Sequence, residues 1–113
     1  MAERLIGNFP GPLEIRVAQD RPECVAYLEG ELDVSTSERL RAELLALIED
    51  GCRSLVIDMS ELVLIDSTGL GVLVGILKRM LQHGGEMVLK GPRRSARKVF
   101  GITGLDRVFT IVD

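Results

Sequence analysis

The sequence contains few of the side chains that build metal and catalytic centres. Its 113 residues include one histidine, two cysteines and no tryptophan. A single histidine, His83, cannot form a zinc site that needs two or more, and Cys24 and Cys52 are too far apart for a Cys-x-x-Cys pair. His83 also precedes two glycines, which is typical of the last turn of a helix and does not favour a Ser-His-Asp triad. We expect two buried thiols in a reducing compartment, no metal, no cofactor and no catalysis.

Long apolar runs and an excess of positive charge are also missing. The longest stretch without a charged residue, 67–77, has 11 residues, whereas a membrane-spanning helix needs about 20. Glu3 and the lack of a long apolar run argue against a signal peptide at the start of the chain. The net charge of −3 argues against nucleic acid as the main partner. We therefore expect a cytoplasmic protein that binds neither membrane nor nucleic acid.

What is present is the pattern of one globular α/β domain, expected to span residues 1–113. Glycines and prolines predict a lead-in loop over residues 1–11. Strands are expected over 13–17 and 24–28, and the short link between them predicts an antiparallel pair. Further strands are expected at 55–57, 86–90 and 109–112, and helices from 35 to 50, from 66 to 83 and from 93 to 100.

The resulting order, β-β-α-β-α-β-α-β, predicts an open, mostly parallel sheet with one antiparallel edge strand. The continuous apolar run Leu55–Ile57 predicts a central strand that is covered on both faces. Segments 30–34 and 59–65 are expected to be loops.

Two helix starts carry further expectations. Ser35 and Glu38 have the spacing of a capping box at the start of the first helix. The glycines of the second helix, Gly69, Gly71 and Gly75, lower its intrinsic stability and predict a close approach of helix and sheet.

A cluster of basic residues near the end of the chain allows two interpretations. Within residues 90–107 six basic side chains accompany one acid, Asp106. A solvated helix face is the simpler interpretation, and a surface that attracts an anion or a partner is the other. The basic residues are Lys90, Arg93, Arg94, Arg97, Lys98 and Arg107.

The most informative residue is Ser67, which lies between Asp66 and a glycine-rich helix start. As an ordinary N-cap, its hydroxyl would bond a free backbone amide. However, the helix is expected to begin at the carboxyl end of a parallel strand, the edge where open α/β sheets place ligand and partner sites. Residues 30–33 should reach the same edge if their strand is parallel. An accessible serine among carboxylates, without catalytic groups nearby, indicates a surface that is modified.

Several segments resemble the STAS domain family, specifically bacterial anti-sigma-factor antagonists. The central signature covers residues 55–60 and 65–73, the latter reading Ile-Asp-Ser-Thr-Gly-Leu-Gly-Val-Leu. The Gly-Glu-Leu-Asp sequence at 30–33 is similar to the early motif of the family, and residues 102–109 are similar to its closing segment. The resemblance covers about residues 12–113 and implies the STAS fold for this domain.

The resemblance also implies a phosphorylation switch. The unmodified antagonist would bind an anti-sigma factor that is also a serine kinase, and would thereby release a sigma factor. Phosphorylation of Ser67 would block that binding, and a serine phosphatase would reverse it. Thr68, where many relatives carry a second serine, would be a minor alternative site. The resemblance implies a partner-binding set made of Glu31, Asp33, Asp66, Ser67, Thr68 and Gly69. The continuous apolar pattern, without a cluster of ligand residues, separately predicts a monomer or weak dimer.

Two alternatives remain at this point. A STAS domain can also serve as a non-phosphorylated scaffold subunit in a stress-signalling or lipid-transport assembly, although a scaffold does not need Ser67. A nucleotide-binding or nucleotide-hydrolysing protein is the third reading, and the lack of a Gly-x-x-x-x-Gly-Lys-Ser/Thr loop counts against it.

Overall fold

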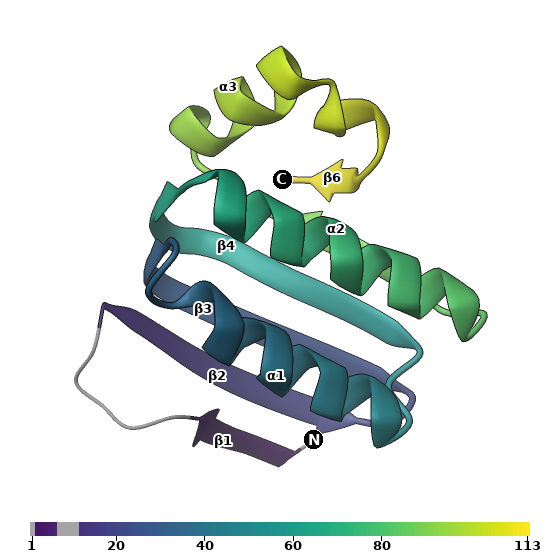
Figure 1. Ribbon diagram of the computed structural model, residues 1–113. Helices are drawn as coiled ribbons and strands as arrows, with labels where there is room; N and C mark the ends of the chain where they lie inside the picture. The colour runs from purple at the N-terminus through teal and green to yellow at the C-terminus, as the bar shows by residue number, and fades with distance from the viewer. Residues whose placement is uncertain (1, 7–11) are drawn as a thin grey trace.

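The computed structural model describes residues 2–6 and 12–113, which form one six-stranded sheet with helices packed against it (Figure 1). The strands follow one another across the sheet in chain order: β1 Ala2–Ile6, β2 Leu13–Asp20, β3 Glu23–Leu32, β4 Ser54–Ile65, β5 Glu86–Lys90 and β6 Thr110–Val112. The helices are α1 Ser37–Glu49, α2 Ser67–Gln82 and α3 Arg94–Thr103, followed by a short 3-10 turn at Leu105–Arg107.

The strand pairing confirms the predicted class, an open and mostly parallel sheet with an antiparallel edge. β3, β4, β5 and β6 pair in parallel, while β2 is antiparallel to β3. The lead-in loop predicted over residues 1–11 is wrong in part, because Ala2–Ile6 forms β1, which pairs antiparallel with β2. The glycines and prolines that predicted a loop all lie at residue 7 or later, so they carried no information about residues 2–6. Residues 1 and 7–11 lie outside the described residues.

One face of the sheet carries the core. α1 and α2 lie side by side across that face (Figure 1). Burial alternates along β4, with Leu55 and Ile57 buried and Val56 only half-buried. The prediction that this strand is covered on both faces is therefore wrong. Right-handed crossovers between parallel strands that advance in one direction place their helices on a single face, so the other face stays open.

β3 and β4 are longer than predicted, because each continues by pairing with the other. The pairing runs as far as Leu32 with Ile65, so the loops expected over 30–34 and 59–65 are wrong for most of their length. Gly30 signals a bulge in β3 and not a turn. Its φ is +110°, and a Cβ there would lie 2.1 Å from the carbonyl oxygen of Pro12, so that only glycine fits.

The start of α1 also differs from the prediction. The N-cap is Thr36, without a side-chain cap bond, and Ser35 instead bonds the carboxylate of Asp33. The capping box expected from Ser35 and Glu38 is therefore wrong. Thr36 is buried and its hydroxyl donates to the carbonyl oxygen of Glu31, which leaves it engaged with the preceding strand.

Both cysteines are buried and free, as predicted. Burial raises the pKa of the Cys52 thiol to about 12, and the neighbouring Cys24 adds to this shift. Over residues 2–6 and 12–113, no helix is both long and apolar enough to cross a membrane.

Ile57 tests the position of β4 at the centre of the core. Its side chain is 0% exposed, so Ile57→Ala should leave a cavity and lower the free energy of unfolding by about 2–5 kcal/mol. Val56→Ala, one residue away on the open face, is the matched control and should cost less. Urea denaturation measures both, and a loss below about 1 kcal/mol for Ile57→Ala would contradict the assignment.

Candidate functional site

The candidate site is the edge of the sheet where β3 and β4 end side by side. Leu32 and Ile65 form the last pair of the two strands, and Asp33 and Asp66 come directly after them. The backbone amide of Asp66 donates to the carbonyl oxygen of Leu32 at 3.1 Å, which ties the two strand ends together. The parallel pairing therefore brings the 30–33 segment and the Ser67 segment to one edge, as the sequence predicted.

Asp66, and not Ser67, caps α2. Its backbone is extended, and its carboxylate accepts a hydrogen bond from the amide of Gly69 at 2.9 Å. Ser67 is therefore the first helical residue, and its side chain is exposed. Its hydroxyl makes no hydrogen bond to the residues that the structure describes. An exposed hydroxyl without a structural task is available for chemical modification.

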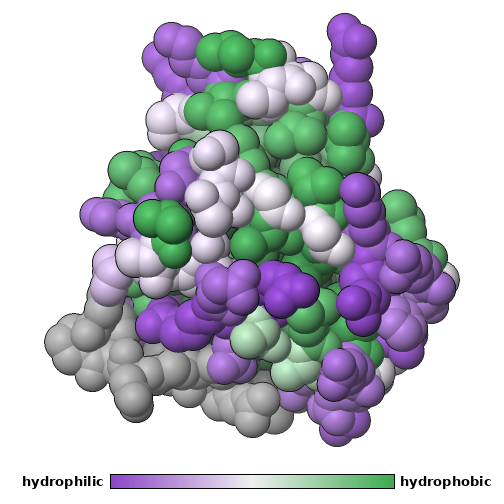
Figure 2. All heavy atoms as spheres, in the orientation of Figure 1, coloured by the Kyte–Doolittle hydropathy of each residue, from purple (hydrophilic) through white to green (hydrophobic). Residues whose placement is uncertain are grey.

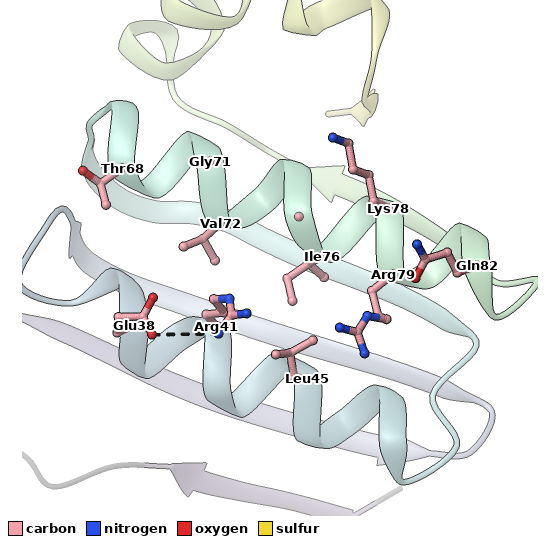
Figure 3. Close-up of a pocket in the computed structure, with 11 residues that line it drawn as sticks. Glu38, Arg41, Leu45, Thr68, Gly71, Val72, Ile76, Lys78, Arg79 and Gln82 are labelled. Carbon is pink, nitrogen blue, oxygen red and sulfur yellow. Dashed lines mark ion pairs between the residues drawn. The ribbon is translucent and has the colours of Figure 1, made fainter.

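Thr68 is also exposed, but it faces a different part of the surface. Its side chain lies at one end of a groove between α1 and α2 (Figure 3), whereas Ser67 does not line that groove. The hydroxyl of Thr68 therefore lies at the groove, and the hydroxyl of Ser67 lies outside it. Ser67, the main predicted modification site, and Thr68, the minor one, are thus on different parts of the surface.

Gly69 holds the first turn of α2 against the end of β3. A Cβ at this position would lie 2.7 Å from Cγ of Leu32. The predicted close approach is confirmed here. It is wrong for Gly71 and Gly75, where an added Cβ would meet nothing within 4 Å.

Asp33 anchors the turn that leads into α1. Its carboxylate accepts bonds from the Ser35 hydroxyl at 2.6 Å and from the Ser35 amide at 2.9 Å. These bonds, with smaller contributions from Thr36, hold the pKa of Asp33 below its ordinary value. Asp33 therefore stays negatively charged beside the candidate site. Glu31 is half-buried within β3, and its amide donates to Pro12, so its partner-binding role remains a prediction.

The groove between α1 and α2 was not anticipated from the sequence. It has a volume of about 490 Å³ and runs along both helices (Figure 3). We call it the α1–α2 groove; it is lined by Glu38, Arg41 and Leu45 of α1 and by Thr68, Gly71, Val72, Gly75, Ile76, Lys78, Arg79 and Gln82 of α2. Figure 2 shows pale and green side chains along α2 in the middle of this face, bordered by hydrophilic ones. Gly71 and Gly75, four residues apart, were the signal for this groove in the sequence. They were predicted to face the sheet, whereas they face the groove.

Three exposed apolar side chains accompany the site. Val34 is 73% exposed next to Asp33, and Val63 and Leu64 are exposed at the end of β4. Nothing in the sequence signalled this exposure, because Val34 falls in the predicted loop 30–34 and Val63 and Leu64 fall in the predicted loop 59–65. Exposed apolar groups beside a polar centre are typical of a protein-binding surface.

The basic cluster lies on and around α3. Arg93 pairs with Glu61 at 3.6 Å, and Arg97 pairs with Asp113 at 2.6 Å. The remaining basic side chains are exposed, namely Lys90, Arg94, Lys98 and Arg107. For Arg93 and Arg97, these ion pairs favour the simpler interpretation, a solvated helix face.

Comparison with known proteins agrees with this arrangement. A model of the STAS domain family matches residues 14–113. The anti-sigma-B factor antagonist of Bacillus subtilis (strain 168) is 33% identical over 99 residues, which are 88% of this chain and 90% of the relative. The solved structure of the anti-sigma factor antagonist SpoIIAA in its unphosphorylated form has a TM-score of 0.77 and 27% identity, covering 88% of each chain. The structure of the Bacillus cell fate determinant SpoIIAA in the phosphorylated form has a TM-score of 0.70 and 26% identity, covering 88% of this chain and 91% of that one.

Alanine at the glycines of α2 should act with opposite signs. Gly71→Ala should raise the free energy of unfolding by about 0.5–1 kcal/mol, because alanine favours the helix and meets no neighbour. Gly69→Ala should lower it by about 1–3 kcal/mol, since the new methyl group overlaps Leu32. Urea denaturation compares the two variants, and a shift of the same sign in both would contradict the packing.

The Asp33 turn should be visible in its titration. Ser35→Ala removes the main cause of the lowered pKa, so the pKa of Asp33 should rise toward its ordinary value. Because the folded pKa is the lower one, the charged carboxylate stabilises the fold above the unfolded pKa of about 3.9. That stabilisation disappears as the pH falls through the folded pKa. Carboxyl-carbon NMR follows the titration, and an unchanged pKa in Ser35→Ala would rule out this cause.

Proposed function

The chain belongs to the STAS domain family, and from that premise we propose that it is an anti-sigma factor antagonist whose binding is switched by phosphorylation of Ser67. The observation that carries the proposal is the exposed Ser67 hydroxyl, left free because Asp66 caps α2. Similar solved structures named as phosphorylated and unphosphorylated forms of SpoIIAA support a fold that accommodates both states.

In this proposal the unmodified protein binds an anti-sigma factor that has serine kinase activity, and a sigma factor is released. The exposed apolar side chains of Val34, next to Asp33, and of Val63 and Leu64, near the end of β4, provide contact area. Glu31, Asp33, Asp66, Thr68 and Gly69 complete the proposed surface. The protein acts by binding, in the cytoplasm and as a monomer or weak dimer, without catalysis of its own. A serine phosphatase returns it to the binding state.

The local charges explain why a phosphate on Ser67 would affect binding more than folding. The phosphate adds about −1.5 to −2 charge at pH 7. The free amides and dipole at the start of α2 favour it by about 0.3–1 kcal/mol, and the nearby Asp33 and Asp66 oppose it by repulsion of similar size. Inside an interface, a desolvated phosphate without a counter-ion costs several kcal/mol. The fold should therefore persist while the complex is lost.

The neighbouring hydroxyl of Thr68 is the minor alternative. Because its side chain lines the α1–α2 groove, a phosphate on Thr68 would lie on a different surface from one on Ser67.

The alternative function is a STAS scaffold subunit that is never phosphorylated. Such a scaffold has no need of the free Ser67 hydroxyl, which is why we prefer the switch.

Ser67 variants test the switch. Ser67→Ala should bind the anti-sigma factor kinase encoded in the same genome with unchanged affinity and should not be phosphorylated. Ser67→Asp should keep its melting temperature and bind at least about 100-fold more weakly, as expected for a loss of about 3 kcal/mol. Calorimetric titration gives the affinities, and intact mass gives the phosphorylation.

Thr68→Ala locates the modified hydroxyl, because it removes the adjacent hydroxyl and leaves Ser67 in place. It should still be phosphorylated, with the phosphate on Ser67. Phosphate found mainly on Thr68 would move the switch by one residue, and equal affinity of the phosphorylated and unmodified proteins would remove it.

A further inference from the structure

The α1–α2 groove contains two glycines that the domain itself does not use. Gly71 and Gly75 lie in the interior of a helix, where glycine is among the poorest residues. Both are exposed, and an added Cβ would meet no atom within 4 Å. By contrast, Gly69 is needed for packing, and Gly85 would place a Cβ 2.6 Å from the carbonyl oxygen of Arg53. The missing side chains at 71 and 75 therefore leave space on the outer surface of α2.

The shape of this space matches a helix. Residues four apart lie on the same side of α2, one turn from each other, so the two glycines open a continuous strip of backbone. Small residues at this spacing let a second helix approach closely. The floor of the groove is apolar, formed by the half-buried Leu45 and by Val72 and Ile76, which are buried in the core of the domain (Figure 3). From Thr68 to Gln82 the groove is about 20 Å long, or four turns, at 1.5 Å per residue.

The charge of the groove is opposite to that of the protein. Arg41 and Arg79 extend into it from the two helices, and Lys78 lies on the far side of α2 (Figure 3). Glu38 is the only acid among the lining residues, and its distance of 3.9 Å from Arg41 makes a weak, exposed pair. The whole chain has a net charge of −3, so this positive surface is local. Such a surface attracts an acidic partner and repels a basic one.

We propose that the α1–α2 groove is a docking surface for an acidic amphipathic helix of a partner protein. The apolar side of that helix packs against the half-buried Leu45, its backbone lies close to the exposed Gly71 and Gly75, and its carboxylates face Arg41 and Arg79. The groove ends at Thr68, next to Ser67. Ser67 does not line the groove, but it precedes Thr68 directly, so the negative charge of a phosphate on Ser67 repels an acidic helix from the first turn of α2 and weakens docking; only this regulatory step rests on the proposed function.

A designed peptide tests the docking surface without knowledge of the partner. The probe is a lactam-stabilised helix of about 16 residues with glutamates on one side and leucines on the other, long enough to span the groove. We expect it to shift the NMR signals of the Thr68, Gly71 and Gly75 amides and to bind more weakly as salt increases. Two control peptides carry lysine in place of glutamate, or the same residues without the helical pattern. Binding of either control with equal affinity, shifts confined to another surface, or no binding would overturn the proposal.

Variants of the full chain locate the contact. Gly75→Leu fills the groove, Arg79→Glu reverses its charge, and each should weaken peptide binding by at least about tenfold. Ala46→Leu, on α1 outside the groove, and Lys98→Glu, on α3, are the matched controls and should bind normally. The smaller change Gly75→Ala should raise the melting temperature by about 2–6 °C and still weaken binding, which separates lost docking from lost folding. Normal binding by Gly75→Leu and Arg79→Glu would contradict the proposal.

Kinase assays on the same variants separate this inference from the proposed function. Phosphorylation of Ser67 in a protein whose groove binds no peptide would overturn the docking surface and leave the switch intact. Docking of the peptide to a protein that no kinase phosphorylates would overturn the switch and leave the docking surface intact. Self-association of the chain that is abolished by Gly75→Leu would identify a second copy as the occupant and would also overturn the proposal.

Discussion

The parallel pairing of β3 with β4, carried as far as Leu32 and Ile65, is the contact on which the rest of the structure depends. Because the two strands end together, Asp33 and Asp66 follow them at one edge and the helices α1 and α2 begin there. The β3–β4 pairing shifts its register at Gly30, whose missing side chain also lets β3 pass close to Pro12 on its other side. A shorter pairing would leave both carboxylates on separate loops, and the edge would not exist as a defined surface.

At this edge each carboxylate has a structural task, and the serine does not. Asp33 closes the turn before α1 through Ser35, and Asp66 caps α2 through Gly69. These bonds fix two negative charges beside a hydroxyl that remains exposed. Asp66 is thereby both the cap that frees Ser67 and part of its electrostatic surroundings. A substitution of Asp66 would change both properties together, whereas a substitution of Ser67 leaves the cap in place.

The sequence was sufficient for the order of most elements and for the location of the edge, because both follow from apolar periodicity and from the geometry of parallel strands. It was insufficient where a local signal has two structural outcomes. Gly30 indicated a turn, but a glycine with positive φ also fits a bulge inside a strand. Ser35 and Glu38 have the spacing of a capping box, but the hydroxyl and amide of Ser35 donate to the carboxylate of Asp33 instead. Which side of α2 holds its glycines depends on the rotation of that helix against the sheet, and neighbouring glycines do not define that rotation.

That rotation is set by the large side chains of α2 and by Gly69. Leu73, Ile76 and Met80 are buried, which turns the helix so that Gly69 contacts β3 while Gly71 and Gly75 face outward. One helix therefore has a first turn held tightly against the sheet and a middle that is open to solvent. Stability comes from the buried side, so residues on the outer side can serve binding without a large cost to the core. The Ser67 edge and the α1–α2 groove adjoin at the first turn of this helix, through the exposed Ser67 and Thr68, so two neighbouring surfaces rest on the same buried packing.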